Sequence, residues 1–168
     1  MNKIETLRYL DQHQINYEKV DHPAVFNMAD LANLHLPHPE ADAKNLFIRD
    51  DQKKDYYLLT VKGNKKVNLQ QFRQKFGTRR LTFASPEDLK KFLQVTPGSV
   101  TPLALLNNAD VQIPLYLDAY FLKQPLIGMH PNDNTATIWL NSGDLINLIN
   151  LINLIKAHGN PVHLVDFA

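Results

Sequence analysis

One short stretch decides the fold: Asp42-Ala43-Lys44-Asn45-Leu46-Phe47-Ile48-Arg49-Asp50. Its apolar centre predicts a buried strand, and the charged residues 50–54 predict a turn. The stretch Tyr56-Tyr57-Leu58-Leu59-Thr60-Val61 then returns as the partner strand, so a hairpin forms the centre of the sheet. Lys44 stands where the first strand begins, and its ammonium can reach from the sheet edge into a cleft. We therefore expect a site lysine at this position.

Length and composition predict one domain. The chain has 168 residues, of which 44% are hydrophobic and 21% charged, as is ordinary for a globular protein with one core. We expect a single α+β domain over residues 1–168, with a central mixed β-sheet and surrounding helices. No cysteine is present, which excludes disulfides, thiolate catalysis and cysteine-bound zinc. The first residues predict an amphipathic helix rather than a signal peptide, and no apolar run reaches membrane-spanning length, so we expect a cytoplasmic location.

Charge is distributed unevenly along the chain. The net charge is only +1, yet the segment from Lys44 to Lys91 holds thirteen Lys or Arg against five Asp or Glu, an excess of eight positive charges. A one-sided basic surface would attract phosphates and bind nucleic acid in a salt-dependent way. A lysine-rich face of a folded protein can also be exposed to solvent without binding a partner. Both interpretations stay open on charge alone.

Apolar periodicity and capping residues predict the remaining elements. The helices are expected at residues 3–12, 28–35, 68–77 and 85–93, and from 142 to a stop at 158–161. The strands are expected at residues 17–20, 81–83, 111–118, 135–140 and 162–165. Proline at position 114 places the strand over 111–118 near an edge or a bulge.

Two motifs that could hold a metal or a nucleotide do not fit their patterns. His22, His35 and His38, with Glu40, suggest a metal site, but the segment is broken by prolines and has no histidine pair at helical spacing. Loop histidines are the favoured interpretation. Residues 63–66 lack the glycine, lysine and hydroxyl spacing of a phosphate-binding loop, so we reject that interpretation.

Two loops can carry chemistry. Residues 96–102, Thr-Pro-Gly-Ser-Val-Thr-Pro, form a stiff loop whose glycine permits close approach of backbone N–H groups to an oxygen. By composition alone this loop is a connector. Residues 128–134 form a polar loop around His130, which can be a general base, a hydrogen-bond donor to substrate or a residue that stabilises the loop.

Four ordered blocks together resemble a known family: residues 44–50, 81–85, 95–102 and 130–137. The chain resembles the superfamily of YbaK and prolyl-tRNA synthetase-associated editing domains, and most closely the free-standing alanyl-tRNA(Pro) deacylases. The resemblance covers nearly the whole chain. The departure is Leu-Ile-Asn repeated three times from Leu145, where a period of three drifts around a helix of 3.6 residues per turn. We interpret it as a local duplication that can form a contact surface.

The resemblance implies a mixed sheet with surrounding helices and an enzyme that hydrolyses the ester joining a wrong amino acid to tRNA(Pro). A synthetase pocket sized for proline cannot strongly reject alanine, because a missing methylene is worth only about 1–3 kcal/mol. A second, smaller pocket is therefore needed. The resemblance implies catalytic roles for Lys44, Asn45, Gly98 and His130, and substrate contacts for Val25, Met28, Phe47, Ser99, Pro102 and Asn132.

The implied roles differ among these residues. Lys44 would bind the phosphate or ribose end of the substrate, and Asn45 would orient the ester or the ribose hydroxyls. Gly98, in the loop that ends at Pro102, would supply backbone donors to the carbonyl or amino group. His130 would lie in the loop that closes the amino-acid pocket. The resemblance implies no cofactor and no metal, and a ribose hydroxyl of the substrate would help to activate the attacking water.

Three functions remain open on the sequence. The first is hydrolysis of alanyl-tRNA(Pro), and the second is the same chemistry on another ester such as cysteinyl-tRNA(Pro). The third is a non-catalytic module that binds tRNA or a synthetase through the basic surface. The expected partners are the acceptor end of tRNA(Pro) and, as a further candidate, prolyl-tRNA synthetase, with no membrane.

Overall fold

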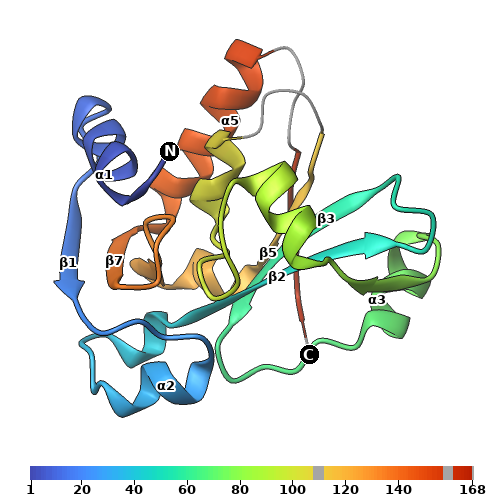
Figure 1. The fold of residues 1–168 in the computed structure, drawn as a ribbon, viewed down its shortest axis with the longest axis horizontal. Coiled ribbons are helices and arrows are strands. Elements are labelled where there is room, and N and C mark those ends of the chain that lie inside the picture. Colours follow the sequence, from blue (N-terminus) through green and yellow to red (C-terminus); the bar gives the residue numbers. More distant parts are fainter. Residues whose placement is uncertain (108–111, 157–160, 168) are drawn as a thin grey trace.

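The computed structural model describes residues 1–107, 112–156 and 161–167, with the backbone alone for 151–156. The α-helices are α1 (Lys3–Gln12), α2 (Met28–Asn33), α3 (Leu69–Phe76), α4 (Pro86–Asp88) and α5 (Ser142–Lys156). The strands are β1 (Tyr17–Asp21), β2 (Ala43–Asp50), β3 (Tyr56–Lys62), β4 (Leu81–Phe83), β5 (Leu115–Asp118), β6 (Leu126–Met129), β7 (Ala136–Asn141) and β8 (Val162–Val165). Short helical turns cover η1 (Pro39–Ala41), η2 (Leu89–Leu93), η3 (Pro102–Asn107) and η4 (Ala119–Lys123). Figure 1 shows helices packed around the strands, which confirms the predicted α+β class.

The predicted hairpin of β2 and β3 forms the middle of a five-stranded sheet in the order β4-β2-β3-β5-β8. β2 pairs antiparallel with β3 and β4, whereas β5 pairs parallel with β3 and β8. The sheet is therefore mixed, as predicted. Asp50 closes the hairpin turn, because its buried carboxylate accepts hydrogen bonds from the backbone N–H groups of Lys54 (2.7 Å) and Asp55 (3.3 Å).

A second, antiparallel sheet contains β1, β7 and β6 in that order. The sequence patterns did not predict it, because they indicated one sheet and placed Gly128 and Met129 in a loop. Both residues lie in β6, where Gly128 pairs with Trp139. A Cβ at Gly128 would stand 2.8 Å from the indole nitrogen of Trp139, so the missing side chain makes room for that ring. An isolated parallel bridge between Asp42 and Gly128 joins the two sheets.

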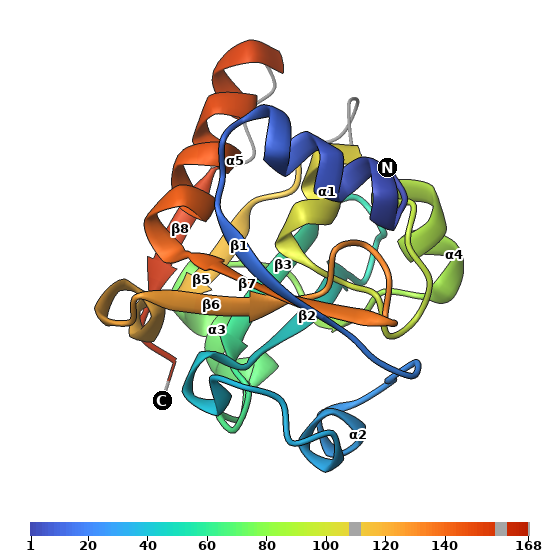
Figure 2. The ribbon, with the colours of Figure 1, turned by 90° about the vertical axis from the view of Figure 1, so that its left-hand side faces the viewer.

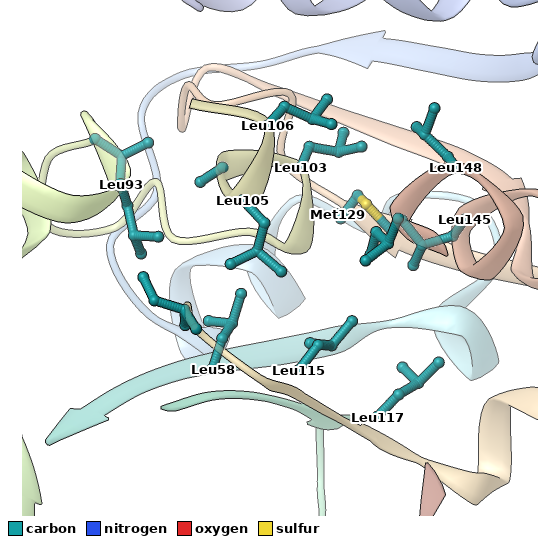
Figure 3. Packing of buried hydrophobic residues seen from close by; sticks show 14 of the residues in the cluster. Leu58, Leu93, Leu103, Leu105, Leu106, Leu115, Leu117, Met129, Leu145 and Leu148 are labelled. Atoms are coloured by element: carbon teal, nitrogen blue, oxygen red, sulfur yellow. The ribbon is translucent and has the colours of Figure 1, made fainter. Parts of the chain in front are cut away.

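The main core lies between one face of the five-stranded sheet and the elements η3, α5 and β6 that pack against that face. Figure 3 shows Leu58, Leu115 and Leu117 on the sheet facing leucines from η3 and α5, with Met129 of β6 beside them. A smaller cluster on the other side of this sheet is built around Phe72 of α3. Helices therefore cover both faces of the sheet. α2 and α5 lie at opposite ends of the molecule (Figures 1 and 2).

Most local predictions agree with the structure. α1 begins with a capping box between Asn2 and Glu5, and α3 is capped by Asn68 and ends at Gly77, whose φ is +64°. The predicted second helix is shorter than expected and ends at Asn33. In α5, Leu145, Leu148 and Ile149 are buried, and the third Leu-Ile-Asn unit falls where only the backbone is described. Residues 108–111 and 157–160, which include the predicted start of one strand and most of the predicted helix stop, lie outside the described residues.

Candidate functional site

A cavity of about 320 Å³ lies where the start of β2 meets β6 and the segment before α2. The bridge between Asp42 and Gly128 forms part of its wall, so both sheets contribute to it. Its lining consists of Val25, Phe26, Asn27, Met28, Leu31, Asp42, Ala43, Lys44, Asn45, Leu46, Gly98, Val100, Gly128, Met129, His130 and Thr137. The lining is mostly apolar, with a few polar groups converging on it, which is the usual character of a small-molecule site.

Lys44 is the second residue of β2 and lines the cavity. Its ammonium donates a hydrogen bond to the backbone carbonyl of Lys65. Lys65 is itself held in place, because its ammonium lies 3.0 Å from the buried carboxylate of Asp118. Partial burial lowers the pKa of Lys44 below its ordinary value of 10.5. The site lysine is therefore positioned by a loop that is anchored in the core.

Asn45 follows in β2 and also lines the cavity. It pairs with Thr60 of β3, and its side-chain oxygen accepts a hydrogen bond of 2.7 Å from the hydroxyl of Thr60. The side-chain oxygen already has a partner, and the amide nitrogen remains as the group of Asn45 that can donate to a substrate.

Gly98 brings the loop over 96–102 against the segment before α2. Its φ is +89°, and a Cβ at this position would stand 3.0 Å from the carbonyl oxygen of Val25 and 3.2 Å from the ring of Phe26. Asn134 also contacts this segment, since its side-chain amide donates a hydrogen bond of 2.8 Å to the carbonyl oxygen of Val25. Glycine is needed here for both conformation and space, and this packing makes the loop more than a connector.

His130 lies at the end of β6 on the cavity wall. Its Nδ1 atom donates to the carbonyl oxygen of Ala136 at 2.8 Å. Burial is the largest influence on the ring and lowers the pKa of His130, with the neighbouring His22 acting in the same direction. The imidazole is therefore held in the neutral form over a wider pH range, with Nε2 as an acceptor.

The structure brings together six of the ten predicted site residues: Val25, Met28, Lys44, Asn45, Gly98 and His130. The other four are not among the lining residues, and the substrate contacts expected for them stay predictions. Phe47 is buried in the core with its ring stacked on Tyr56. Ser99 and Pro102 are buried within their loop and at the start of η3.

Asn132 is the fourth of these residues, and its contacts are structural. Its φ is +60°, and its amide donates to the carbonyl of Met1 at 3.1 Å and to the hydroxyl of Thr6 at 3.0 Å. The side chain thus fastens α1 to the loop before β7. The sequence pattern could not separate this role from a substrate contact.

Sequence reasoning missed three polar residues of the cavity, Asn27, Asp42 and Thr137. Thr137 bonds to Nε2 of His22 at 2.9 Å. Burial, assisted by the nearby charge of Glu40, raises the pKa of Asp42 to about 6. The sequence feature that could have indicated Asp42 was its position two residues before Lys44, where the strand begins.

The loop histidines have partners of other kinds. His22 also contacts the carbonyl of Pro23 at 2.8 Å, and His38 lies 2.8 Å from a carboxylate oxygen of Glu18. Within the described ranges 1–107, 112–156 and 161–167, no group of three or more His, Asp or Glu residues is arranged to hold a metal ion. None of the described helices has the length and apolar character needed to cross a bilayer.

The basic segment is partly neutralised by its own fold. Arg49 pairs with Asp88 at 3.2 Å, and Arg79 pairs with Asp51 at 2.8 Å. The exposed cations of this segment that are outside these pairs are Lys53, Lys54, Lys66, Arg73, Lys75, Arg80, Lys90 and Lys91. They belong mainly to the β2–β3 turn, α3 and η2, so the positive charge is carried by the half of the molecule that contains the hairpin.

Comparison with known proteins identifies relatives along most of the chain. The model of the aminoacyl-tRNA editing domain matches residues 22–148. The prolyl-tRNA editing protein ProX of Acetoanaerobium sticklandii is 30% identical over 157 residues, which cover 94% of this chain and 92% of that protein. Prolyl-tRNA synthetase associated domain-containing protein 1 of Mus musculus is 32% identical over 158 residues, covering 91% and 89%.

A solved structure described as a candidate trans-editing enzyme for prolyl tRNA synthetase has the same fold. It superposes with a TM-score of 0.66 at 17% identity and covers 99% of this chain and 97% of its own. At that identity the likeness concerns the fold. The matching region includes every residue of the cavity described above, since the lining runs from Val25 to Thr137.

Proposed function

The chain belongs to the aminoacyl-tRNA editing domain family, and from this premise we propose that it hydrolyses alanyl-tRNA(Pro), releasing alanine and intact tRNA(Pro). The family makes the chain an aminoacyl-tRNA deacylase, and its ProX relative is a prolyl-tRNA editing protein. The choice of alanine is our own. We propose further that one editing domain spans residues 1–168 and acts in the cytoplasm, where the tRNA is charged.

The observation that carries the proposal is the apolar cavity beside Lys44. Val25, Met28 and Leu31 give one side of the cavity an apolar surface. The methyl group of alanine offers no hydrogen bond, so a pocket can prefer alanine over proline only by being too small for the pyrrolidine ring. An apolar wall beside a lysine and an asparagine suits a small aliphatic aminoacyl ester.

The reaction needs few groups from the protein. Lys44 holds the phosphate or ribose of the terminal adenosine by charge, and the amide nitrogen of Asn45 donates to an ester or ribose oxygen. Water, assisted by a ribose hydroxyl of the substrate, attacks the ester carbonyl. The carbon–oxygen bond to the ribose then breaks, and the ribose oxygen takes up a proton. Donors near Gly98 stabilise the negative charge that develops on the carbonyl oxygen, and neutral His130 limits the mouth of the pocket.

The partner is the acceptor end of tRNA(Pro). Exposed cations on α3 and the β2–β3 turn, such as Lys53 and Lys75, suit a phosphate backbone. A relative that is a proline–tRNA ligase of Levilactobacillus brevis is 33% identical over 97 residues, which supports prolyl-tRNA synthetase as a second candidate partner.

The test is hydrolysis of alanyl-, cysteinyl- and prolyl-tRNA(Pro) by the purified protein. We expect rapid release of alanine and slow release of proline. Preference for the cysteinyl ester would move the chain to the alternative substrate. Tight binding of tRNA without turnover of any ester would instead favour a non-catalytic binding module.

A further inference from the structure

Asp42 occupies a fixed place between two cavities. It lines the site cavity, and it also lines an adjoining cavity of about 470 Å³ together with Met28, Glu40 and Lys62. Its backbone is held on both sides, because its carbonyl oxygen accepts a hydrogen bond of 2.8 Å from the N–H of Gly63 and its chain forms the bridge with Gly128. The aspartate therefore cannot easily be withdrawn from the wall.

The carboxylate of Asp42 differs from the other buried carboxylates of the protein. Asp50 and Asp118 are fully buried, and both accept hydrogen bonds from backbone N–H groups. For the half-buried carboxylate of Asp42, by contrast, neither a hydrogen bond nor an ion pair is found with any residue in the described parts of the chain. A partly dehydrated carboxylate without a partner is unfavourable, and it is the environment that a cationic ligand would complete.

The cations near the cavity are engaged elsewhere. The ammonium of Lys44 bonds to the carbonyl of Lys65, and that of Lys62 lies over the ring of Tyr120, 4.2 Å from its centroid. Glu40, the nearest carboxylate of η1, lies within ion-pair distance of His38 at 3.7 Å. Neither lysine therefore forms an ion pair with Asp42 in the described structure, and a cationic ligand can supply the complementary charge.

The substrate of a deacylase carries such a charge. Every aminoacyl ester has an α-ammonium group one carbon from the bond that is broken, and hydroxy-acid or peptidyl esters lack it. We infer that Asp42 binds the α-ammonium group of the aminoacyl ester and selects esters that carry a free amino group. This inference rests on the proposed function and assigns a substrate-binding residue to its site, with the methyl group directed toward the apolar wall.

The consequence is a second filter, independent of side-chain size. Size exclusion at Met28 and Val25 separates alanine from proline, but it cannot separate an alanyl ester from a lactyl ester, whose hydroxyl replaces the amino group at nearly the same volume. A charged hydrogen bond to Asp42 can make that distinction.

The experiment compares alanyl-tRNA(Pro) with lactyl-tRNA(Pro) at pH 7, where the carboxylate is ionised and the α-amino group is largely protonated. For wild type, Asp42→Asn and Asp42→Glu, the quantity measured is the ratio of kcat/KM for the two esters. Both kcat/KM values are measured on the same preparation of each variant, so any decrease in its folded fraction cancels in the ratio. The matched control is Glu40→Gln, which neutralises the neighbouring carboxylate.

We expect Asp42→Asn to lower the alanyl-to-lactyl ratio by roughly 10- to 100-fold, the range expected for loss of a charged hydrogen bond. Asp42→Glu should keep a ratio above that of the asparagine variant, and Glu40→Gln should keep the wild-type ratio. Active wild type with an unchanged ratio in Asp42→Asn would overturn the role of Asp42 and leave the proposed function standing. Hydrolysis of neither ester by wild type would overturn both.

Discussion

The Nδ1 atom of His130 lies 2.8 Å from the carbonyl oxygen of Ala136, so the imidazole is fixed across the loop that joins β6 to β7. A carbonyl can only accept, and Nδ1 therefore carries the proton. Burial lowers the pKa of His130 below its ordinary value of 6.5. At neutral pH the ring is neutral, and the acceptor Nε2 is available at the mouth of the cavity.

The first prediction concerns the pH dependence of hydrolysis. In the proposed site His130 is a neutral ring at the mouth of the pocket and Asp42 is ionised, and both states are lost as the pH falls, because the pKa of His130 is below 6.5 and that of Asp42 is about 6. We expect kcat/KM for alanyl-tRNA(Pro) to be constant between pH 6.5 and 7.5 and to decrease below this range. In Asp42→Asn the part of the decrease centred near pH 6 should disappear. Activity that increases from pH 7 to pH 5 would contradict the assigned protonation states.

The second prediction concerns stability at the same aspartate. The pKa of Asp42 is raised to about 6 in the folded protein, whereas its pKa in the unfolded chain is about 3.9. Asp42 therefore does not destabilise the fold below about pH 3.9, and stability is lost as the pH rises from there through about 6. Asp42→Asn should therefore raise the free energy of unfolding at pH 7.5 by about 1 kcal/mol, after allowance for screening at a half-buried site, and by much less at pH 4. Urea unfolding at the two pH values measures the difference. Equal effects at both would show that the carboxylate is not perturbed.

The third prediction compares two glycines with positive φ. Gly98→Ala places a Cβ against the carbonyl of Val25, whereas Gly77→Ala, at φ +64°, meets nothing within 4 Å. The Gly77 variant should lose about 1 kcal/mol of stability from conformation alone and keep wild-type hydrolysis. The Gly98 variant should lose about 1–3 kcal/mol and most of its activity, because its loop moves away from Val25. Thermal unfolding and alanyl-tRNA(Pro) hydrolysis check both. A fully active Gly98→Ala variant would remove the loop from the site.

The fourth prediction concerns size selection. Met28 lines the cavity at the start of α2, so Met28→Ala should enlarge the pocket. The rate ratio of alanyl- to prolyl-tRNA(Pro) should fall by roughly tenfold, about the discrimination that one methylene provides. Leu122→Ala serves as the control, because Leu122 is half exposed in η4 and outside the cavity lining. An unchanged ratio in the Met28 variant would remove Met28 from the selective wall.

The sequence predicted those parts of the fold whose signals are local. The hairpin of β2 and β3 follows from an apolar strand, a charged turn and an apolar return, and Asp50 closes it with hydrogen bonds to residues four and five positions on. The caps of α1 and α3 are local in the same way. In the candidate site, Lys44, Asn45 and Gly98 lie in short stretches of one strand or one loop, and the roles expected for them follow from the resemblance of those stretches to the family.

The second sheet could not be predicted in this way. β1 pairs with β7, which lies near the other end of the chain, and nothing in residues 17–21 indicates that partner. Asn132 illustrates the same difficulty, since its role depends on Thr6 of α1. The importance of Asp42 depends on burial and on Glu40, and both are tertiary properties.

The most direct test of the central claim, that the cavity beside Lys44 is the deacylation site, is the rate of alanine release from alanyl-tRNA(Pro) by wild type and Lys44→Ala. Lys44 heads β2 and contributes little to the core, so the variant should fold, as circular dichroism and thermal unfolding would verify. Lys123→Ala, at the exposed end of η4 and outside the cavity lining, is the matched control. We predict rapid release by wild type and by the control, and a loss of roughly 100-fold or more in Lys44→Ala. Wild-type release by a folded Lys44→Ala variant would contradict the claim.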